Sequence, residues 1–240
     1  MNETNREFRV MTSGAFTAAY FSLIPQLERL TRAKVVTVTT SVGTGDISIA
    51  SRLKRGEVAH IVIIAEPLFR QFAADGLVLS DGHAAIARSI IAMAVRDGER
   101  KPDIGTAEAL KKTLLAAKSI GYSASESGKY FTGELVQRLG IADQVLPKSQ
   151  LVGGGVRVGA RIASGELEIG FQQVSELLPI QGIAHITPLP PELQKVTTVV
   201  ACIAATAPDQ NLAREVIRFL ASPETAQAKT KTGLEPTSDR

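Results

Sequence analysis

The strongest constraint on the fold is an alternation of strand-like and helix-like segments along nearly the whole chain. Short apolar segments with the length of strands occur at residues 8–11, 35–39 and 61–65. Each is followed by a segment in which apolar residues recur every three or four positions, as on one face of a helix. Because parallel strands are joined by crossover connections that are usually helices, this alternation predicts an α/β protein with mostly parallel sheets and flanking helices.

Two long apolar segments, residues 89–95 and 196–207, each begin where one block of strand and helix units ends. A chain of 240 residues is long enough for one large domain or two modest ones. We therefore predict two lobes joined by two crossing segments that form a hinge. One lobe is made of residues 1–84 and 197–240, and the other of residues 85–196.

Composition and charge exclude several classes of function. Lys and Arg number 27 against 24 Asp and Glu, the two kinds are interspersed, and aromatic residues make up only 5%, so we expect no nucleic-acid binding. No segment has the ~18 apolar residues of a membrane helix, so we expect no membrane insertion. The first nine residues lack the apolar core of a signal peptide. This predicts a cytoplasmic protein as the sequence is written, and a periplasmic one if a signal peptide has been trimmed from it.

Four junctions between a strand and the following helix carry hydroxyl or amide side chains, in most cases with a glycine. The N–H groups at the start of a helix attract anions, and in α/β sheets such loops meet at the carboxyl ends of the strands, where ligands bind. Helix capping explains any one of these residues more simply, but four such loops together favour a site for a small anion. The candidate ligand-binding residues are Thr12, Ser13, Ser41, Thr44, Ser123, Ser125, Ser127, Gly128, Gln172 and Gln173.

Motifs for common cofactors are incomplete. Residues 127–129 resemble the end of a P-loop, but Tyr130 stands where a Ser or Thr would bind magnesium. Residues 43–45 lack the third glycine of a dinucleotide-binding fingerprint. The three histidines are far apart in the sequence, without the ligand spacing of a zinc site. We therefore expect no cofactor and no bound metal. The single cysteine, Cys202, lies in an apolar segment and is interpreted as a buried small hydrophobic residue.

Several stretches of the chain resemble the molybdate-binding-like extracellular solute-binding proteins. They are residues 52–57 (RLKRGE), 117–123 (AKSIGYS), 165–179 (GELEIGFQQVSELLP) and 188–197 (PLPPELQKVT). The resemblance extends from about residue 8 to residue 236. It implies a type 2 periplasmic-binding-protein fold, in which two α/β lobes hold a ligand between them, in agreement with the two predicted crossing segments.

The resemblance also implies roles for the four loops. In the family, their hydroxyl and N–H groups bind the anion, and the match is most direct at Ser13. The second loop, residues 40–45, is longer than the compact Ser-Ser-Gly typical of molybdate binders, which suggests a different ligand. Arg157 adds a cation at the start of another helix. We therefore predict a solute-binding protein for a molybdate-like oxyanion or a small carboxylate. If the chain is exported, an ABC transporter permease is its expected partner.

The sequence also supports a second function as an alternative. Residues 127–141 (SGKYFTGELVQRLGI) and 169–180 (IGFQQVSELLPI) resemble the aconitate isomerase branch of the same fold. This implies an isomerase that moves a proton along the allylic system of an unsaturated tricarboxylate, which needs an acid or base near the substrate carbon. The candidate catalytic residues are Glu126, Lys129 and Tyr130, although a solvated helix N-terminus explains them more simply. A cytoplasmic sensor is a third class, but no additional interaction domain supports it.

Overall fold

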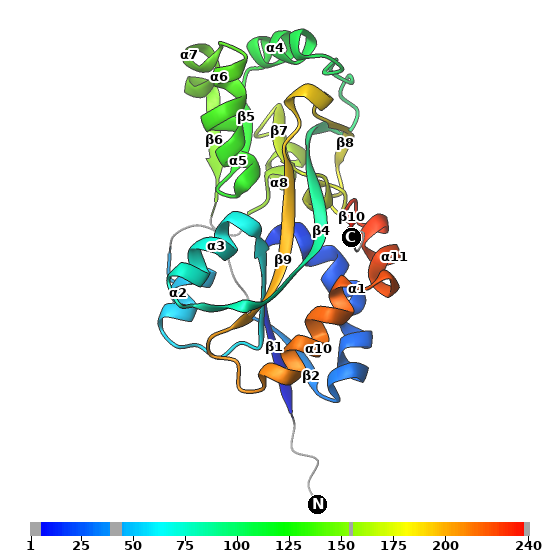
Figure 1. Cartoon of the computed structure of the whole chain (residues 1–240). Coiled ribbons are helices and arrows are strands. Elements are labelled where there is room, and N and C mark those ends of the chain that lie inside the picture. The colour runs from blue at the N-terminus through cyan, green and yellow to red at the C-terminus, as the bar shows by residue number, and fades with distance from the viewer. Residues whose placement is uncertain (1–5, 39–44, 154–155, 238–240) are drawn as a thin grey trace, which may run out of the picture. The chain divides into compact units, whose positions relative to one another are not determined.

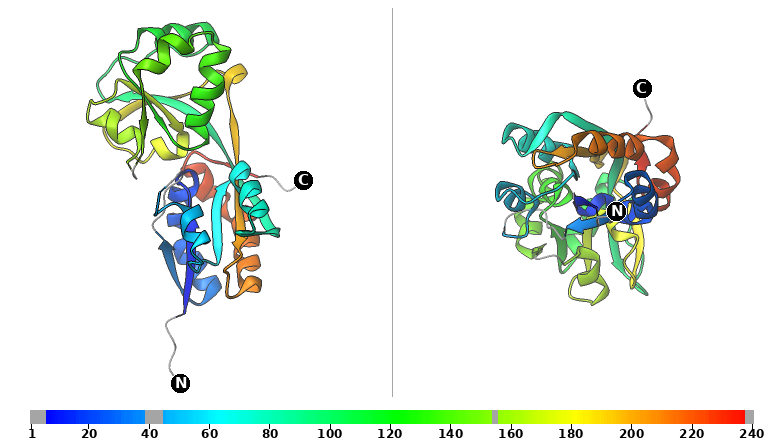
Figure 2. Two further views of the ribbon diagram at one scale, coloured as in Figure 1. Left: turned by 90° about the vertical axis from the view of Figure 1, so that its left-hand side faces the viewer. Right: turned by 90° about the horizontal axis from the view of Figure 1, so that it is seen from below.

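The computed structural model describes residues 6–38, 45–153 and 156–237, and the chain folds into two compact units (Figures 1 and 2). Unit 1 consists of residues 1–89 and 197–240, and unit 2 of residues 90–196. Both units combine a sheet with flanking helices, so the predicted α/β class is confirmed. The chain passes from unit 1 to unit 2 between residues 89 and 90 and returns to unit 1 between residues 196 and 197.

The sheet of unit 1 is parallel around β1. This strand pairs in parallel with β2 and β3, whereas β3 pairs antiparallel with β9. The strands are β1 (Glu7–Thr12), β2 (Lys34–Val38), β3 (Ile61–Ala65), the first part of β4 (Val78–Arg96), β9 (Val196–Ala204) and β10 (Glu235–Pro236), which pairs with β4. The helices are α1 (Gly14–Thr31), α2 (Ile49–Lys54), α3 (Glu66–Ala74), α10 (Gln210–Ala221) and α11 (Ala226–Lys231).

Alternate residues of these strands pack against helices on opposite faces of the sheet. On β3, Ile61 and Ile63 belong to the core that contains α1 and α10, whereas Val62 and Ile64 belong to the core that contains α2 and α3 (Figure 1). A strand buried on both faces is apolar at every position, which is why this segment was recognisable in the sequence. Cys202 is fully buried in the second of these cores, as predicted.

The sheet of unit 2 places three strand ends together. β5 pairs in parallel with β6 and β7, and β4 pairs antiparallel with β7 and β8. The strands are the second part of β4, β5 (Ile120–Ser123), β6 (Ser149–Val152), β7 (Ile169–Gln173) and β8 (Ile183–Pro188). The helices are α4 (Ala107–Ala116), α5 (Glu126–Tyr130), α6 (Val136–Arg138), α7 (Ala142–Val145), α8 (Val158–Ala163) and α9 (Val174–Leu177), with a π-helical turn, η1 (Phe131–Leu135), between α5 and α6. Because β5, β6 and β7 run in the same direction, their carboxyl ends lie at one edge of the sheet.

Several strands differ from the prediction, among them β4, β6 and β8. β4 is 19 residues long. Polar residues such as Asp81 and His83 interrupt the apolar pattern in its first part, so the sequence does not indicate a strand there. β6 and β8 are short and mostly accessible to solvent, so they lack the apolar pattern of a buried strand. In β8, His185 also has a left-handed backbone, with φ of 50°.

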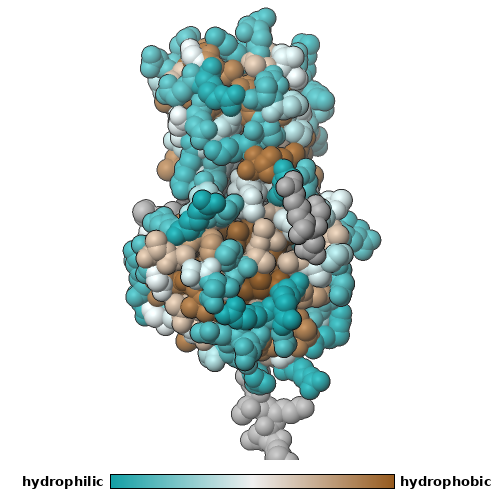
Figure 3. Space-filling model, viewed as in Figure 1, coloured by the Kyte–Doolittle hydropathy of each residue, from teal (hydrophilic) through white to brown (hydrophobic). Residues whose placement is uncertain are grey.

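Hydrophobic residues on the face of unit 1 shown in Figure 3 reach the surface in groups separated by hydrophilic residues. The two most exposed large hydrophobic side chains, Phe21 and Leu151, belong to different units. Scattered apolar residues are normal on protein surfaces and indicate no docking face. In the part of the chain that the structure describes, no helix combines the length and apolar character needed to cross a membrane.

Candidate functional site

Three serine hydroxyls gather where β5 ends in unit 2. The Oγ atoms of Ser123 and Ser125 are 2.7 Å apart, and the Oγ atom of Ser127 lies 3.3 Å from that of Ser123 and 3.2 Å from that of Ser125. Ser127 is fully buried, whereas the other two are partly exposed. Ser125 is the N-cap residue of α5, but its side chain makes no capping hydrogen bond. Because each O–H bond can rotate, the hydroxyls can turn from one another toward a ligand.

Gly128 allows the chain to fold back on this strand end. A Cβ atom added to Gly128 would overlap the carbonyl oxygen of Ser123. The N–H of Gly128 donates a hydrogen bond of 3.0 Å to the carbonyl of Ser125. Only glycine permits this close approach of two backbone segments, so Gly128 fixes the spacing of the serine loop.

The neighbouring strand, β7, ends beside the serine loop. Tyr122 of β5 lies opposite Phe171 of β7 in the parallel register. The next residues along the two strands, Ser123 and Gln172, therefore lie side by side at the usual spacing of about 4.8 Å between strands. Gln172 is buried, and its Oε1 atom accepts no hydrogen bond from the described residues. Both residues are among the candidates predicted from the sequence, and the sheet brings them together.

Glu176 places a buried carboxyl group next to these amides. Its side chain hydrogen-bonds with that of Gln172 and accepts a hydrogen bond from the backbone N–H of Gln173. Gln173, which is also buried, is the N-cap of α9, so the second contact is that of a capping box. Burial raises the pKa of Glu176 to about 7, although the charge of Arg157 and the two hydrogen bonds act in the opposite direction. Glu176 therefore titrates near neutral pH.

Ser175, the residue before this carboxyl group, is also buried on α9. Its Oγ atom has no hydrogen-bond partner among the described residues. Buried polar atoms without a partner are uncommon in folded proteins, and each calls for a specific explanation. Together with the Oε1 atom of Gln172, the hydroxyl of Ser175 offers unused hydrogen-bonding capacity at this edge of the sheet.

Arg157 adds a positive charge to the same edge. It is the N-cap residue of α8, which follows the end of β6, and it is half-buried. Its guanidinium has no carboxylate within 4.0 Å among the described residues, unlike Arg161, which pairs with Glu166. A guanidinium binds a carboxylate through two parallel hydrogen bonds. The edge therefore combines neutral hydroxyl donors, one cation and a titratable acid.

The structure gives other partners to the three residues predicted as catalytic. Lys129 donates a hydrogen bond of 2.8 Å to the carboxylate of Glu126 in an ion pair at the surface. Tyr130 is buried in the core of unit 2, and its hydroxyl donates a hydrogen bond of 2.7 Å to the carbonyl of Leu193. These contacts account for all three side chains without a ligand.

In unit 1, Ser13 lies at the start of α1, directly after β1. Its N–H donates a hydrogen bond of 2.8 Å to the carbonyl of Ile63, and its side chain makes no capping hydrogen bond. The buried Thr12 donates its hydroxyl proton to the carbonyl of Ser13. The Ser13 hydroxyl is thus not used as a helix cap. The other two predicted residues of this unit, Ser41 and Thr44, lie outside the described residues.

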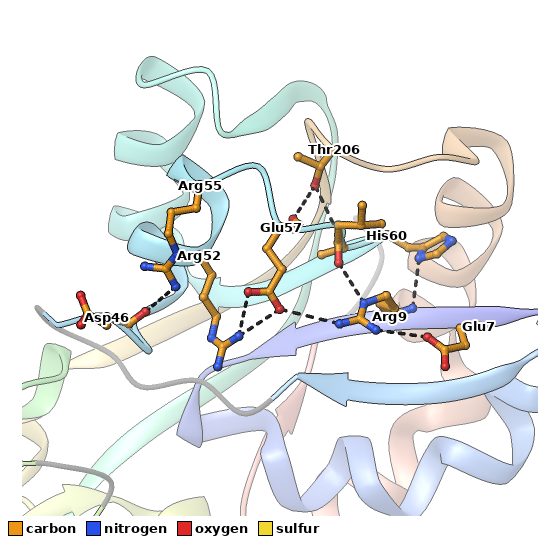
Figure 4. A network of polar contacts seen from close by, with 10 residues as sticks. Glu7, Arg9, Asp46, Arg52, Arg55, Glu57, His60 and Thr206 are labelled. Atoms are coloured by element: carbon orange, nitrogen blue, oxygen red, sulfur yellow. Dashed lines mark hydrogen bonds and ion pairs between the residues drawn. The ribbon is translucent and has the colours of Figure 1, made fainter.

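A second polar network in unit 1 joins β1, α2 and the residues before β3 (Figure 4). The Nη1 atom of Arg52 lies 2.7 Å from the carboxylate of Glu57, which is also 3.7 Å from the guanidinium of Arg9. The backbone N–H of Arg9 donates to Nδ1 of His60, whose pKa is lowered mainly by burial. Arg9 and His60 also line a surface hollow of about 400 Å³. Arg9 and Arg52 are thus both paired with Glu57.

Two residues of the site, Ser175 and Glu176, were not among the candidates selected from the sequence. The available signal was an acid at the third position after an N-cap, inside the apolar segment 174–180. An isolated acid in such a segment is normally expected on the exposed face of a helix. In addition, no group of three or more His, Cys, Asp and Glu residues that could hold a metal ion occurs in the described ranges.

Comparison with known proteins gives matches over nearly the whole chain. A family model described as bacterial extracellular solute-binding protein matches residues 8–235. The aconitate isomerase of Pseudomonas sp is 33% identical over 228 residues, which cover 95% of this chain and 87% of that protein.

Solved structures show the same fold at lower identity. The periplasmic molybdate-binding protein of Azotobacter vinelandii has a TM-score of 0.74 and is 16% identical, with 96% of this chain and 100% of that chain covered. PEB3 of Campylobacter jejuni with bound L-phospholactate has a TM-score of 0.72 at 12% identity, again covering 96% and 100% of the two chains. The predicted periplasmic-binding-protein fold is confirmed by these similarities.

Proposed function

Because this chain belongs to the bacterial extracellular solute-binding protein family, we propose that it binds a small unsaturated polycarboxylate and isomerises it by an allylic proton shift. The observation that carries the binding step is the cluster of the Ser123, Ser125 and Ser127 hydroxyls at the end of β5. An anion can accept all three protons when the O–H bonds rotate away from one another.

Three further observations favour a carboxylate as the ligand. Arg157, at the same edge of the sheet, supplies a planar pair of donors that matches the two oxygens of a carboxylate. The relative with 33% identity over 95% of the chain is an aconitate isomerase, whose substrate has three carboxylates. PEB3, which shares the fold, also binds a ligand with a carboxylate, L-phospholactate. Isomerisation is proposed because the relative with 33% identity is an aconitate isomerase.

Binding can be tested with a thermal-shift and calorimetry panel of cis-aconitate, trans-aconitate, citrate, molybdate, tungstate, sulfate and phosphate. We expect an aconitate to raise the Tm most. A ligand at about 100 times its Kd adds roughly 2.7 kcal/mol to the free energy of unfolding. For a chain of this size, that gain corresponds to several degrees. No effect of any carboxylate would contradict the proposed ligand class.

Catalysis can be tested by incubating either aconitate with the protein and following both isomers by proton NMR. We expect the two isomers to approach the same equilibrium mixture from either side. Heat-denatured protein is the control, because aconitate also isomerises slowly in solution. If the two isomers interconvert no faster at high protein concentration than in this control, the isomerase proposal is wrong.

A second candidate is binding of a molybdate-like oxyanion without catalysis. It is favoured by the neutral donors of the serine cluster, since Lys129 is held in its ion pair with Glu126. Neutral hydroxyls suit a fully dehydrated oxyanion, and the molybdate-binding protein of Azotobacter vinelandii shares the fold. In this case the chain would deliver its ligand to an ABC transporter permease. Tight binding of molybdate together with no response to either aconitate would select this candidate.

A further inference from the structure

The buried carboxyl group of Glu176 has no role in anion binding as proposed above, because an anion is repelled by a second negative charge. We infer that Glu176 is the catalytic residue that removes and returns the proton in the allylic shift, an inference that rests on the proposed isomerase function. The group is 8% exposed on α9, at the carboxyl end of β7. It therefore lies at the edge of the sheet that carries the serine loop.

Parts of four elements meet around this position. Gln172, at the end of β7, hydrogen-bonds with the carboxyl group, and the charge of Arg157, before α8, acts on it. Ser123, at the end of β5, is next to Gln172 across the parallel strand pair. A polycarboxylate held by the serine hydroxyls and Arg157 thus has its carbon chain beside Glu176. Positioning of a carboxyl group near the substrate carbon is the first requirement for general base catalysis.

An unused hydroxyl group supports an anionic ligand at this place. The Oε1 atom of Gln172 and the hydroxyl of Ser175 are buried and have no hydrogen-bond partner in the described part of the chain. Both flank Glu176, one through a hydrogen bond and the other as its neighbour in sequence. The Ser175 hydroxyl can donate a hydrogen bond to a carboxylate of the bound substrate, whereas the Oε1 atom of Gln172 is an acceptor and needs a donor that an ionised carboxylate does not supply.

The proposed step is balanced without any co-reactant. The Glu176 carboxylate takes a proton from the methylene carbon of the bound aconitate, and the C–H electron pair forms a new C=C bond to the central carbon. The electrons of the old C=C bond move to its far carbon, which receives the proton from the Glu176 carboxylic acid. Glu176 returns to its carboxylate form. The carbon skeleton is unchanged and the double bond has moved. The product is the other geometric isomer when the former single bond is held in the opposite conformation.

The charges around Glu176 allow both protonation states. The elements that pack against α9 are β7, α8 and β8. β7 has no charged residue, α8 and its N-cap contribute Arg157 and Arg161, and β8 contributes His185. Arg161 is paired with Glu166, and His185 is exposed. Burial, opposed by the charge of Arg157 and the two hydrogen bonds, leaves the pKa of Glu176 at about 7. A group with such a pKa both accepts and returns a proton near neutral pH.

A purely structural role as a capping-box acid is the alternative to be tested. Glutamine also serves at this position of a capping box, so Glu176→Gln keeps an acceptor for the N–H of Gln173 but cannot take up or return a proton. Glu166→Gln is the matched control, because Glu166 is an exposed acid of the same unit that pairs with Arg161. The wild type and both variants are compared by NMR turnover of trans-aconitate and by calorimetric binding of trans-aconitate.

We expect Glu176→Gln to lower kcat by ~10²- to 10⁴-fold, while the Kd for trans-aconitate changes by less than about 5-fold. The pH profile of kcat/KM should rise through about pH 7 in the wild type and in Glu166→Gln. The residual kcat/KM of Glu176→Gln should not show this rise with pH. Normal turnover by folded Glu176→Gln overturns the assignment and leaves the isomerase proposal intact. If the wild type shows no turnover, the assignment of Glu176 and the isomerase proposal are both wrong.

If Glu176→Gln does not fold, as judged by circular dichroism, Glu176→Asp takes its place. It keeps the carboxyl group but moves it away from the substrate carbon, so we expect kcat to fall by at least about 10-fold with Kd maintained. Turnover by this variant at the wild-type rate would equally overturn the assignment.

Discussion

The free energy of unfolding of Glu176→Gln, relative to that of the wild type, should increase as the pH rises. In the folded chain, burial raises the pKa of this carboxyl group from 4.5 to about 7. The native state therefore holds the proton more tightly than the unfolded state. The stability that this contributes is fully present below pH 4.5 and is lost as the pH rises through about 7. Glutamine does not titrate, and it retains the capping-box contact.

The size of the effect follows from the two pKa values. At about 1.4 kcal/mol per pH unit, the difference between 4.5 and about 7 corresponds to roughly 3 kcal/mol. The free energy of unfolding of Glu176→Gln, relative to the wild type, should thus rise by up to roughly 3 kcal/mol between about pH 4.5 and pH 8. For a chain of this size, at ~2 to 4 °C per kcal/mol, the relative Tm should rise by about 6 to 12 °C.

Urea unfolding followed by circular dichroism at several pH values from 5 to 8 measures this change. Glu166→Gln is the control, because hydrogen bonds to Ser164 and Arg161 lower the pKa of Glu166. This exposed acid is ionised in both states over the whole range, so its difference from the wild type should stay constant. A constant difference for Glu176→Gln as well would refute the reasoning. It would mean that Arg157 and the hydrogen bonds outweigh burial and keep Glu176 ionised.

Three other substitutions test residues that the sequence predicted to bind the ligand or to act in catalysis. Gly128→Ala should destabilise the fold by about 1 to 3 kcal/mol in urea unfolding, because the added methyl group overlaps the carbonyl of Ser123; wild-type stability would show that the loop can shift. Ser13→Ala should change stability by less than about 0.5 kcal/mol, since its hydroxyl caps nothing. The ligand should bind Ser13→Ala ~5- to 150-fold more weakly by calorimetry if the hydroxyl donates to the anion, and an unchanged Kd would show that Ser13 does not bind it. Tyr130→Phe should cost about 1 to 3 kcal/mol, because the buried carbonyl of Leu193 loses its donor; no loss of stability in urea would contradict this packing role.

The sequence predicted the parts of the fold in which local pattern and burial agree. The strand at residues 61–65 is apolar at every position because both of its faces are covered, and its predicted bounds match β3. The short strand β6 was missed because two of its residues, Gln150 and Leu151, are exposed and give no alternation. A strand at the edge of a sheet takes its conformation from its neighbour, here β5, which local sequence does not encode.

The roles of Tyr130 and Lys129 could not be obtained from spacing alone. Both follow the serine loop directly, so the sequence places them near the ligand. Whether they face it depends on which side of the helix is buried and on contacts distant in sequence. The hydrogen bond of Tyr130 reaches Leu193, 63 residues away. The hydroxyls of the loop were identifiable because a strand end, a glycine and a helix start fix their place within a few residues.

Glu176 is a case in which one residue satisfies a local rule and a functional requirement together. As the third residue of α9 it satisfies the N–H of Gln173, which fixes the orientation of its carboxyl group. An exposed acid would do the same with no loss of stability at neutral pH, whereas burial of this one makes its ionised form unfavourable by roughly 3 kcal/mol. A capping role therefore explains the hydrogen bond but not the burial. Proton transfer near neutral pH explains both, because it needs a carboxyl group that is fixed in place and has a pKa close to the working pH.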